Sequence, residues 1–291
     1  MNRKKRIGDR KDGYLIRTLD PISKVSPYIM KTRCGSMNLI NMTIDIDEVD
    51  DYLREKRKNG FKNISMLHFM IATYIRTASQ MPGINRFVNG QKIYARYGIE
   101  ICLAVKKELV LNAPETIVKC KFTPDCTLED VYNILNAKIE EYKNNDDQNK
   151  FDNTAKILNY IPGLFLRFSI GFLSFLDYFG LLPKSLTDVS PFHGSFFITS
   201  MGSLGIPAIF HHLYDFGNLP VFCAYGAKKS VYQLSSTGEP EEKRCMDFSF
   251  ALDERICDGQ YYASCMKFIK KIFKNPAILD KKPEQIVPDI D

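Results

Sequence analysis

The sequence has no C-x-x-C pair, although it contains eight cysteines, at positions 34, 102, 120, 126, 223, 245, 257 and 265. Structural zinc sites usually need such closely spaced pairs, so we expect no metal. Several cysteines alternate with apolar residues, as Cys102 does in IEICLAVK, where a thiol acts as a small apolar side chain. Scattered cysteines of this kind predict free thiols and a reducing, cytoplasmic location.

Three further patterns are absent from the sequence. No apolar run follows the basic start MNRKKR, so no secretory signal is expected. No basic stripe is interleaved with aromatic residues and the net charge is only +6, which argues against nucleic-acid binding. No repeat and no Gly/Ser- or Pro-rich linker divides the chain. We therefore expect an N-terminal arm, residues 1–26, followed by a single domain, residues 27–291.

The longest apolar segment, residues 157–182, is interrupted by Pro162-Gly163, Arg167 and Asp177. A membrane-spanning helix needs about 18 to 20 residues with few or no charges, and neither side of Arg167 provides them. Two short buried helices are the simplest interpretation. A lid, an acyl-chain pocket and a peripheral membrane contact are the alternatives, because exposed aromatic residues on short helices suit all three.

The remaining patterns predict a mixture of strands and helices. Alternating apolar residues predict strands at 99–106, 115–122 and 245–252, with further strands near 195–200 and 221–237. Ser65 is expected to cap a helix over 66–80, where His68 is interpreted as a structural histidine, and Thr127 to open another. The polar run 141–153 predicts a surface loop. This order favours an α/β two-layer sandwich with a mixed sheet and helices on one face.

A strand-to-helix corner, LDERICDGQYYAS, gathers charged residues near the end of the chain. The strand before it and the helix after it each have one regular apolar face. Glu254, Arg255 and Asp258 therefore lie between two rigid elements. Corners of this kind present side chains for chemistry.

The corner DERICDG resembles the D-H-R-x-x-D-G signature of the acyltransferase component of 2-oxo acid dehydrogenase complexes, and the H-x-x-x-D-G motif of chloramphenicol acetyltransferase. SFFITSMGSLG is similar to the T-F-T-I-S-N-L-G-x-F-G segment of that superfamily. PVFCAYGA resembles its next strand, and PYIMKTRCGSMNLINMTIDIDEVDDYL its first strand and helix. The four segments follow the family order between about Pro27 and Leu279. The resemblance implies a CoA-dependent acyltransferase fold and a homotrimer with active sites between subunits.

The resemblance also implies roles for individual residues. In the family, the motif histidine takes a proton from the attacking thiol or hydroxyl, and a Ser or Thr hydroxyl of the neighbouring subunit stabilises the oxyanion. Thr199 falls at the hydroxyl position, with Ser200 beside it as a second candidate. Asp258 falls at the motif aspartate, which orients the corner through an arginine. Arg255 and Gly259 match the arginine and the glycine of the motif.

Glu254 stands where the family has its histidine. A histidine titrates near neutrality, whereas a glutamate has a reference pKa of about 4.3 and is a weak base unless burial raises that pKa. Three hypotheses follow. A buried Glu254 is the base, or His211 or His212 replaces it, or the protein is a non-catalytic relative that binds an acyl-CoA, a protein partner or a membrane surface. CoA or acyl-CoA is the expected substrate, with a small-molecule acceptor.

The segment before Pro27 is too short to hold the lipoyl and subunit-binding segments of the dehydrogenase component. We therefore expect a stand-alone relative that carries no lipoyl group.

Overall fold

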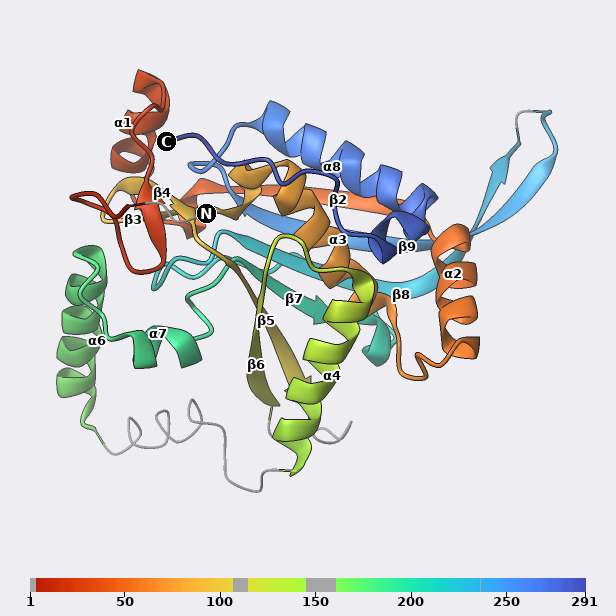
Figure 1. The fold of residues 1–291 in the computed structure, drawn as a ribbon, viewed down its shortest axis with the longest axis horizontal. Coiled ribbons are helices and arrows are strands. Elements are labelled where there is room, and N and C mark those ends of the chain that lie inside the picture. The colour runs from red at the N-terminus through yellow and green to blue at the C-terminus, as the bar shows by residue number, and fades with distance from the viewer. Residues whose placement is uncertain (1–3, 107–114, 145–160, 236) are drawn as a thin grey trace.

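The computed structural model describes residues 4–106, 115–144, 161–235 and 237–291 (Figure 1). Its helices are α1 (Pro21–Ile29), α2 (Asp47–Lys58), α3 (Met66–Gln80), α4 (Leu128–Asn144), α6 (Gly163–Tyr178), α7 (Lys184–Val189) and α8 (Gly259–Lys274). Its strands are β1 (Gly13–Leu15), β2 (Met37–Asp45), β3 (Arg86–Asn89), β4 (Lys92–Arg96), β5 (Ile99–Lys106), β6 (Glu115–Phe122), β7 (Phe196–Ser200), β8 (Val221–Leu234) and β9 (Pro240–Asp253).

The main sheet has six strands in the order β2-β9-β8-β7-β5-β6. Strand β7 runs parallel to both β5 and β8, and the other neighbouring strands are antiparallel. A second, three-stranded sheet has the order β1-β4-β3. The sheet is therefore mixed, as the sequence predicted.

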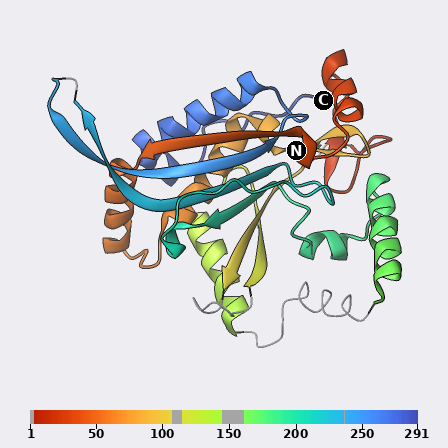
Figure 2. The same cartoon turned by 180° about the vertical axis from the view of Figure 1, so that it is seen from behind.

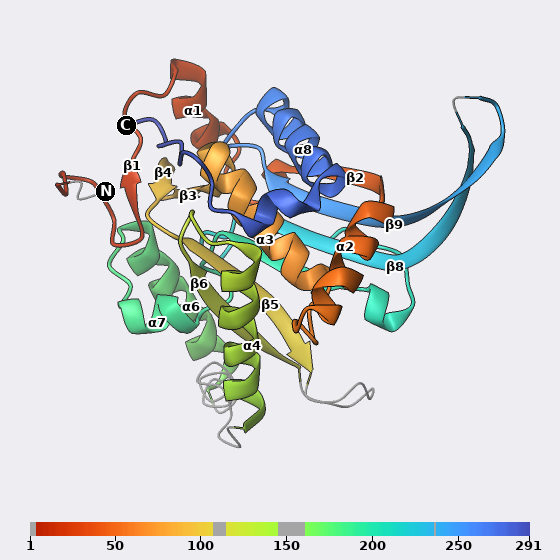
Figure 3. The same cartoon turned by 45° about the vertical axis from the view of Figure 1, so that its right-hand side comes forward.

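Helices α2, α3, α4 and α8 lie on one face of the main sheet (Figures 1 and 3). The alternating side chains of the strands explain this arrangement, because Phe248, Phe250 and Leu252 of β9 point into the main core beneath α8. On α8, Tyr262, Ile269 and other apolar residues at helical spacing form the matching face. The predicted α/β architecture with helices on one face is confirmed.

The opposite face of the sheet, which Figure 2 shows from behind, carries a smaller apolar cluster that includes Phe197, Phe222 and Ala251. The loop between β7 and β8, residues 201–220, covers this cluster with Leu213 and Leu219. Gly217 in this loop has a φ of 84°, and a Cβ there would lie 2.1 Å from the carbonyl oxygen of Phe192. Only glycine fits a turn with that conformation and that contact.

The N-terminal residues are joined to the domain. β1 pairs with β4, and Arg10 is buried. His68 is also buried: its Nδ1 accepts a hydrogen bond from the Ser65 backbone N–H at 3.2 Å, and its Nε2 lies 3.4 Å from Asn136 Oδ1. It is therefore a capping residue of α3.

The apolar segment differs from its simplest interpretation. Helix α6 stands away from the main sheet in Figures 1 and 2, and Phe165, Phe168 and Phe172 are more than half exposed. Its one buried residue is the charged Asp177. The expectation of two buried helices is therefore wrong for the single chain. Residues 157–160, and most of the predicted loop 141–153, lie outside the described residues. No helix in the described part is long and apolar enough to span a membrane.

Candidate functional site

The corner between β9 and α8 is held by a buried group of charged residues. Asp253 is fully buried and accepts hydrogen bonds from Arg255 Nε at 2.8 Å and Arg255 Nη2 at 2.7 Å. Arg33 Nε lies 3.4 Å from the same carboxylate. Each arginine also donates to backbone carbonyls, so that the group ties the corner to the segment before β2 and to the 201–220 loop.

Asp258 forms no ion pair with an arginine of the described residues, although the resemblance implied that it orients the corner through one. Its Oδ1 accepts a hydrogen bond from the Tyr261 N–H at 2.7 Å, and Asp258 is exposed as the N-cap of α8. The resemblance implied that Asp258 orients the corner, whereas in the structure the buried Asp253 holds it through Arg255. Gly259 is the first residue of α8, as expected.

Glu254 is exposed on the single chain. Its backbone N–H donates to the Ser36 carbonyl, and its side chain makes no hydrogen bond or ion pair with the described residues. Its apolar neighbours in the sequence, Leu252 and Ile256, point into the core and do not shield it. The desolvation that a carboxylate base requires is therefore not provided within one chain.

Thr199 and Ser200 lie on different faces at the end of β7. Phe196 and Ile198 belong to the core beneath the helices, whereas Phe197 belongs to the opposite cluster. Since side chains alternate along a strand, Thr199 stands on the same face as Phe197. Ser200 is on the helical side, hydrogen-bonded to the buried Tyr225. Thr199 is therefore the hydroxyl presented beside the 201–220 loop.

His211 lies in that loop with its ring stacked on Phe222, at 4.0 Å between centroids and 2° between planes. His211 Nδ1 is 2.8 Å from the carbonyl oxygen of His212. A carbonyl oxygen only accepts, so Nδ1 carries the proton and donates it. In the neutral ring Nε2 then holds the lone pair, and it has no hydrogen-bond partner among the described residues.

Burial lowers the pKa of His211 below the usual histidine value and outweighs the hydrogen bond to the His212 carbonyl, which raises it. The neutral ring is thus the form present at neutral pH. His212 is exposed and stacks on His211 at 4.6 Å. Of the two histidines, His211 has the environment of a general base.

The strand register places Thr199 far from Glu254, and it places Phe222, on whose ring His211 stacks, at a level between them. Phe222 on β8 pairs with Phe197 on β7, and Thr199 lies two residues further along β7. The Cα atoms of Thr199 and Phe222 are therefore about 8 Å apart. Thr199 pairs with Ala224 on β8, and Ala224 pairs with Ser249 on β9. Glu254 lies five residues after Ser249 in the chain. Five residues extend about 17 Å. The site residues predicted from the sequence therefore separate into two groups within one chain.

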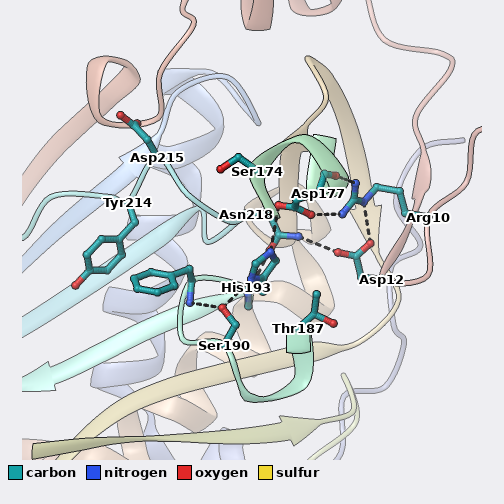
Figure 4. A network of polar contacts seen from close by, with 12 residues as sticks. Arg10, Asp12, Ser174, Asp177, Thr187, Ser190, His193, Tyr214, Asp215 and Asn218 are labelled. Atoms are coloured by element: carbon teal, nitrogen blue, oxygen red, sulfur yellow. Dashed lines mark hydrogen bonds and ion pairs between the residues drawn. The ribbon is translucent and has the colours of Figure 1, made fainter. Parts of the chain in front are cut away.

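A second polar group, missed in the sequence, anchors the end of α6 (Figure 4). Asp177 accepts a hydrogen bond from Arg10 Nη2 at 2.9 Å, and its other oxygen lies 3.1 Å from His193 Nε2. His193 Nδ1 is 2.8 Å from Ser190 Oγ. Burial raises the pKa of Asp177, but the hydrogen bond with His193 and the ion pair with Arg10 outweigh burial and lower the pKa to about 2. All four residues are buried, so this group fixes α6 rather than meeting substrate.

A cavity of about 350 Å³ lies between this anchor and the corner. Its wall includes Arg33 and Arg255 from the corner, Asn89 from β3 and Asp177 from α6. The sequence did not reveal it, because these residues come from four distant segments. No cluster of three or more His, Cys, Asp or Glu residues that could hold a metal ion occurs in the part of the chain that the structure describes. All eight cysteines lie in that part, and none forms a disulfide.

No protein-family model and no curated protein matches the sequence. Solved structures do match. A probable dihydrolipoamide acetyltransferase from Listeria monocytogenes is 14% identical, with a TM-score of 0.56 over 89% of this chain and 94% of that chain. Dihydrolipoamide acetyltransferase from Azotobacter vinelandii is 11% identical, with a TM-score of 0.57 over 95% and 94%. A chloramphenicol acetyltransferase is 10% identical, with a TM-score of 0.53 over 90% and 99%.

These similarities show that the chain has the fold shared by the dihydrolipoamide acetyltransferases and chloramphenicol acetyltransferase, as its motifs indicated. At such low identities the likeness concerns the fold alone.

Proposed function

We propose that this protein is a CoA-dependent acyltransferase in which His211 is the general base. The observation that carries the proposal is the hydrogen bond from His211 Nδ1 to the His212 carbonyl. It fixes the tautomer that leaves Nε2 unprotonated, on the sheet face that presents the Thr199 hydroxyl. The fold is that of acetyltransferases, which supports acyl transfer as the reaction class.

The reaction needs two tasks from these residues. His211 Nε2 takes the proton of the acceptor thiol or hydroxyl as that atom attacks the acyl-CoA thioester carbonyl. The Thr199 O–H donates to the oxyanion of the tetrahedral intermediate, since it has no hydrogen bond to the described residues. When the carbon–sulfur bond breaks, the imidazolium returns the proton to the CoA thiolate. The reverse direction uses the same groups.

Glu254 is the alternative base. It occupies the position of the family histidine. In the Azotobacter vinelandii protein, the catalytic roles of a serine, a histidine and an asparagine have been investigated, and the asparagine lies four residues after the histidine. Glu254 and Asp258 have the same spacing here. Because Glu254 lies about 17 Å along the sheet from the level of Thr199, it could act with a Thr199 hydroxyl only across two chains.

We propose a cytoplasmic homotrimer, supported by the fold and by the free cysteines. Light scattering of the purified protein should give about three times 33.4 kDa. A monomer would leave Glu254 exposed and far from Thr199, and would remove it as a candidate base.

A non-catalytic binding protein is the second candidate function. Two observations favour it, the exposure of Glu254 and the apolar surface of α6. Such a protein would bind an acyl-CoA, a protein partner or a membrane surface without turnover.

A thermal-shift and turnover panel with CoA, acetyl-CoA and longer acyl-CoAs, with thiol, hydroxyl and amine acceptors, tests the proposal. Ligand that binds the folded state raises the melting temperature. His211→Gln should lower the rate of acyl transfer about a hundredfold or more and leave the CoA-induced shift of the melting temperature intact. His212→Gln is its matched control and should leave the rate of acyl transfer unchanged. Binding without turnover in the wild type would favour the second candidate. If the wild type shows neither a CoA-induced shift nor turnover, the proposal is contradicted.

A further inference from the structure

Helix α6 exposes a continuous apolar stripe. Six side chains form it, each more than half exposed: Leu164, Phe165, Phe168, Phe172, Phe175 and the C-capping Phe179. With 3.6 residues per turn, these positions fall within about 100° of one another around the helix axis, and no polar residue lies among them. The half-buried Leu166 and Leu173 and the buried Asp177 lie on the other side of the helix. The stripe therefore points away from the rest of the chain.

The buried end of α6 fixes this orientation (Figure 4). Asp177 pairs with Arg10 and His193, and Arg10 also donates to the Asp177 carbonyl oxygen at 2.7 Å. The O–H of Tyr178 donates to Gln91 Oε1 at 3.0 Å. Turning the helix to bury its stripe would break the buried pairs of Asp177. The exposure of the stripe is therefore a property of the fold.

The exposed charges beside the stripe are positive. Arg167 flanks the stripe on α6, Lys184 begins α7, and Lys92 begins β4, next to the contact between α6 and the β3–β4 turn. All three side chains are exposed, and they form no ion pair with the described residues. Their charges are therefore available to a binding partner.

The nearby carboxylates do not cancel these charges. Asp177 is buried in its own ion pair, and Asp188 on α7 is paired with Lys121. Asp215 is exposed in the cavity wall at the end of α6, where Lys31 offsets its charge. The surface around the stripe therefore keeps a net positive charge, which complements an anionic surface.

The composition of the stripe favours a lipid surface over another protein. Protein interfaces carry about one hydrogen bond per 100–200 Å², and the stripe has no hydrogen-bonding side chain. A second copy in a two-fold contact would bring the same cations against one another. A phenylalanine-rich helix flanked by cations suits the boundary between the headgroups and the acyl chains of a bilayer.

We propose that α6 docks this protein on a membrane surface that contains anionic lipid. The stripe enters the boundary between headgroups and acyl chains, and Arg167 and Lys184 bind lipid phosphates. The contact is peripheral, because α6 has 16 residues and a membrane-spanning helix needs about 20. Docking goes beyond acyl transfer and does not depend on it.

Sedimentation of the full-length protein with vesicles tests the docking. One set of vesicles contains phosphatidylcholine alone, and the other contains equal parts of phosphatidylcholine and phosphatidylglycerol. Binding to the phosphatidylglycerol vesicles should be about tenfold tighter or more, because each cation near an anionic surface contributes a factor of about five. This preference should shrink as the salt concentration rises, because salt screens the attraction.

Two double variants separate the apolar and the charged contributions. Phe165→Ser with Phe175→Ser should weaken binding to the phosphatidylglycerol vesicles about tenfold or more, because less apolar surface enters the bilayer. Arg167→Gln with Lys184→Gln should also weaken it about tenfold, and should reduce its dependence on salt. All four side chains are exposed, so both variants should keep the melting temperature of the wild type within a few degrees.

Lys267→Gln with Lys270→Gln is the matched control for the charge variant. It removes two exposed cations from α8, which lies away from α6 in Figures 1 and 3, and it should bind vesicles like the wild type. The proposal is overturned if the wild type binds neither kind of vesicle or both equally, or if the charge variant binds like its control.

A contact between copies of the chain is the other outcome that would overturn the proposal. Light scattering without vesicles detects it, as a change in mass between the wild type and the Phe165→Ser, Phe175→Ser variant. None of these measurements uses CoA or an acyl acceptor. Failure of the docking would therefore leave the proposed acyl transfer untouched.

Discussion

Arg255 and Asp253, two residues apart at the end of β9, form a pair of parallel hydrogen bonds that is almost fully buried. The pair is extended by Arg33, which reaches the same carboxylate from the segment before β2. One carboxylate thus serves as the counter-charge shared by two buried guanidinium groups. The geometry of the corner depends on it, since each arginine also binds backbone carbonyls on other segments.

Asp253→Asn should therefore be strongly destabilising. The substitution leaves two buried arginines without a counter-charge, and breaking a buried ion pair costs about 3–5 kcal/mol. Asp258→Ala is the control at the same corner, because it removes only an N-cap, worth about 1 kcal/mol. Urea denaturation of both variants gives the two free energies of unfolding. Equal losses would show that the buried group does not hold the corner.

The pH dependence of acyl transfer distinguishes the two candidate bases. His211 must be neutral to accept a proton, and burial lowers its pKa below the usual value of about 6.5. The kcat/KM should thus be constant around neutral pH and fall as the pH drops through that lowered pKa. Activity measured between pH 4 and pH 9 tests this. An acid limb that persists in His211→Gln would assign the titration to another group.

Glu254→Gln keeps the shape of the side chain and removes its basicity. With His211 as the base, acyl transfer should change by less than about threefold, well below the hundredfold loss typical of a missing general base. The measurement is the initial rate with the best acyl-CoA found. A loss of a hundredfold or more, with CoA binding retained, would move the base to Glu254 and require a site shared between chains.

Much of the fold could be predicted from the sequence, because alternation and helical spacing report which face of an element is buried. The strand at 245–252 and the helix at 66–80 are examples, and they recur as parts of β9 and as α3. The order of the four motifs was sufficient to indicate the acyltransferase fold.

The partners of polar residues could not be predicted. Asp177 interrupts an apolar run in the sequence, yet it is the buried residue of α6 because Arg10 and His193 pair with it. Arg33 and Asp253 are separated by 220 positions, so no local pattern joins them. The same limit hid the cavity, and it favoured Glu254 over His211 as the base until the exposure of each was known.

Protein stability should fall in mild acid because of His68. Burial lowers its pKa to about 4, from about 6.5 in the unfolded chain. The unfolded state therefore binds the proton more readily, and stability that is present above pH 6.5 is lost as the pH falls toward 4, by up to about 3 kcal/mol. His68→Gln should remove this dependence and keep the helix cap, since glutamine suits the same capping position. Denaturant unfolding at pH 5 and pH 7 gives the comparison, and an unchanged slope in the variant would contradict it.

The exposed apolar side chains of α6 should contribute to association and not to the stability of the chain. Phe168 and Phe172 are 74% and 53% exposed and lie one helical turn apart. Replacing both by Ser should change the free energy of unfolding of the monomeric chain by less than about 1 kcal/mol, because little buried surface is lost.

The same double variant should reduce self-association or binding to liposomes, since a helix that is apolar on most of its surface requires a cover from outside the chain. Leu234→Ser is the matched control, because Leu234 is 74% exposed on the distant β8–β9 hairpin. Sedimentation with and without liposomes measures both effects. If the Phe variant unfolds several kcal/mol more easily at a dilution where the wild type is monomeric, α6 packs within its own chain. If instead only association is lost, and Leu234→Ser leaves it intact, α6 is a contact surface whose apolar residues act between molecules.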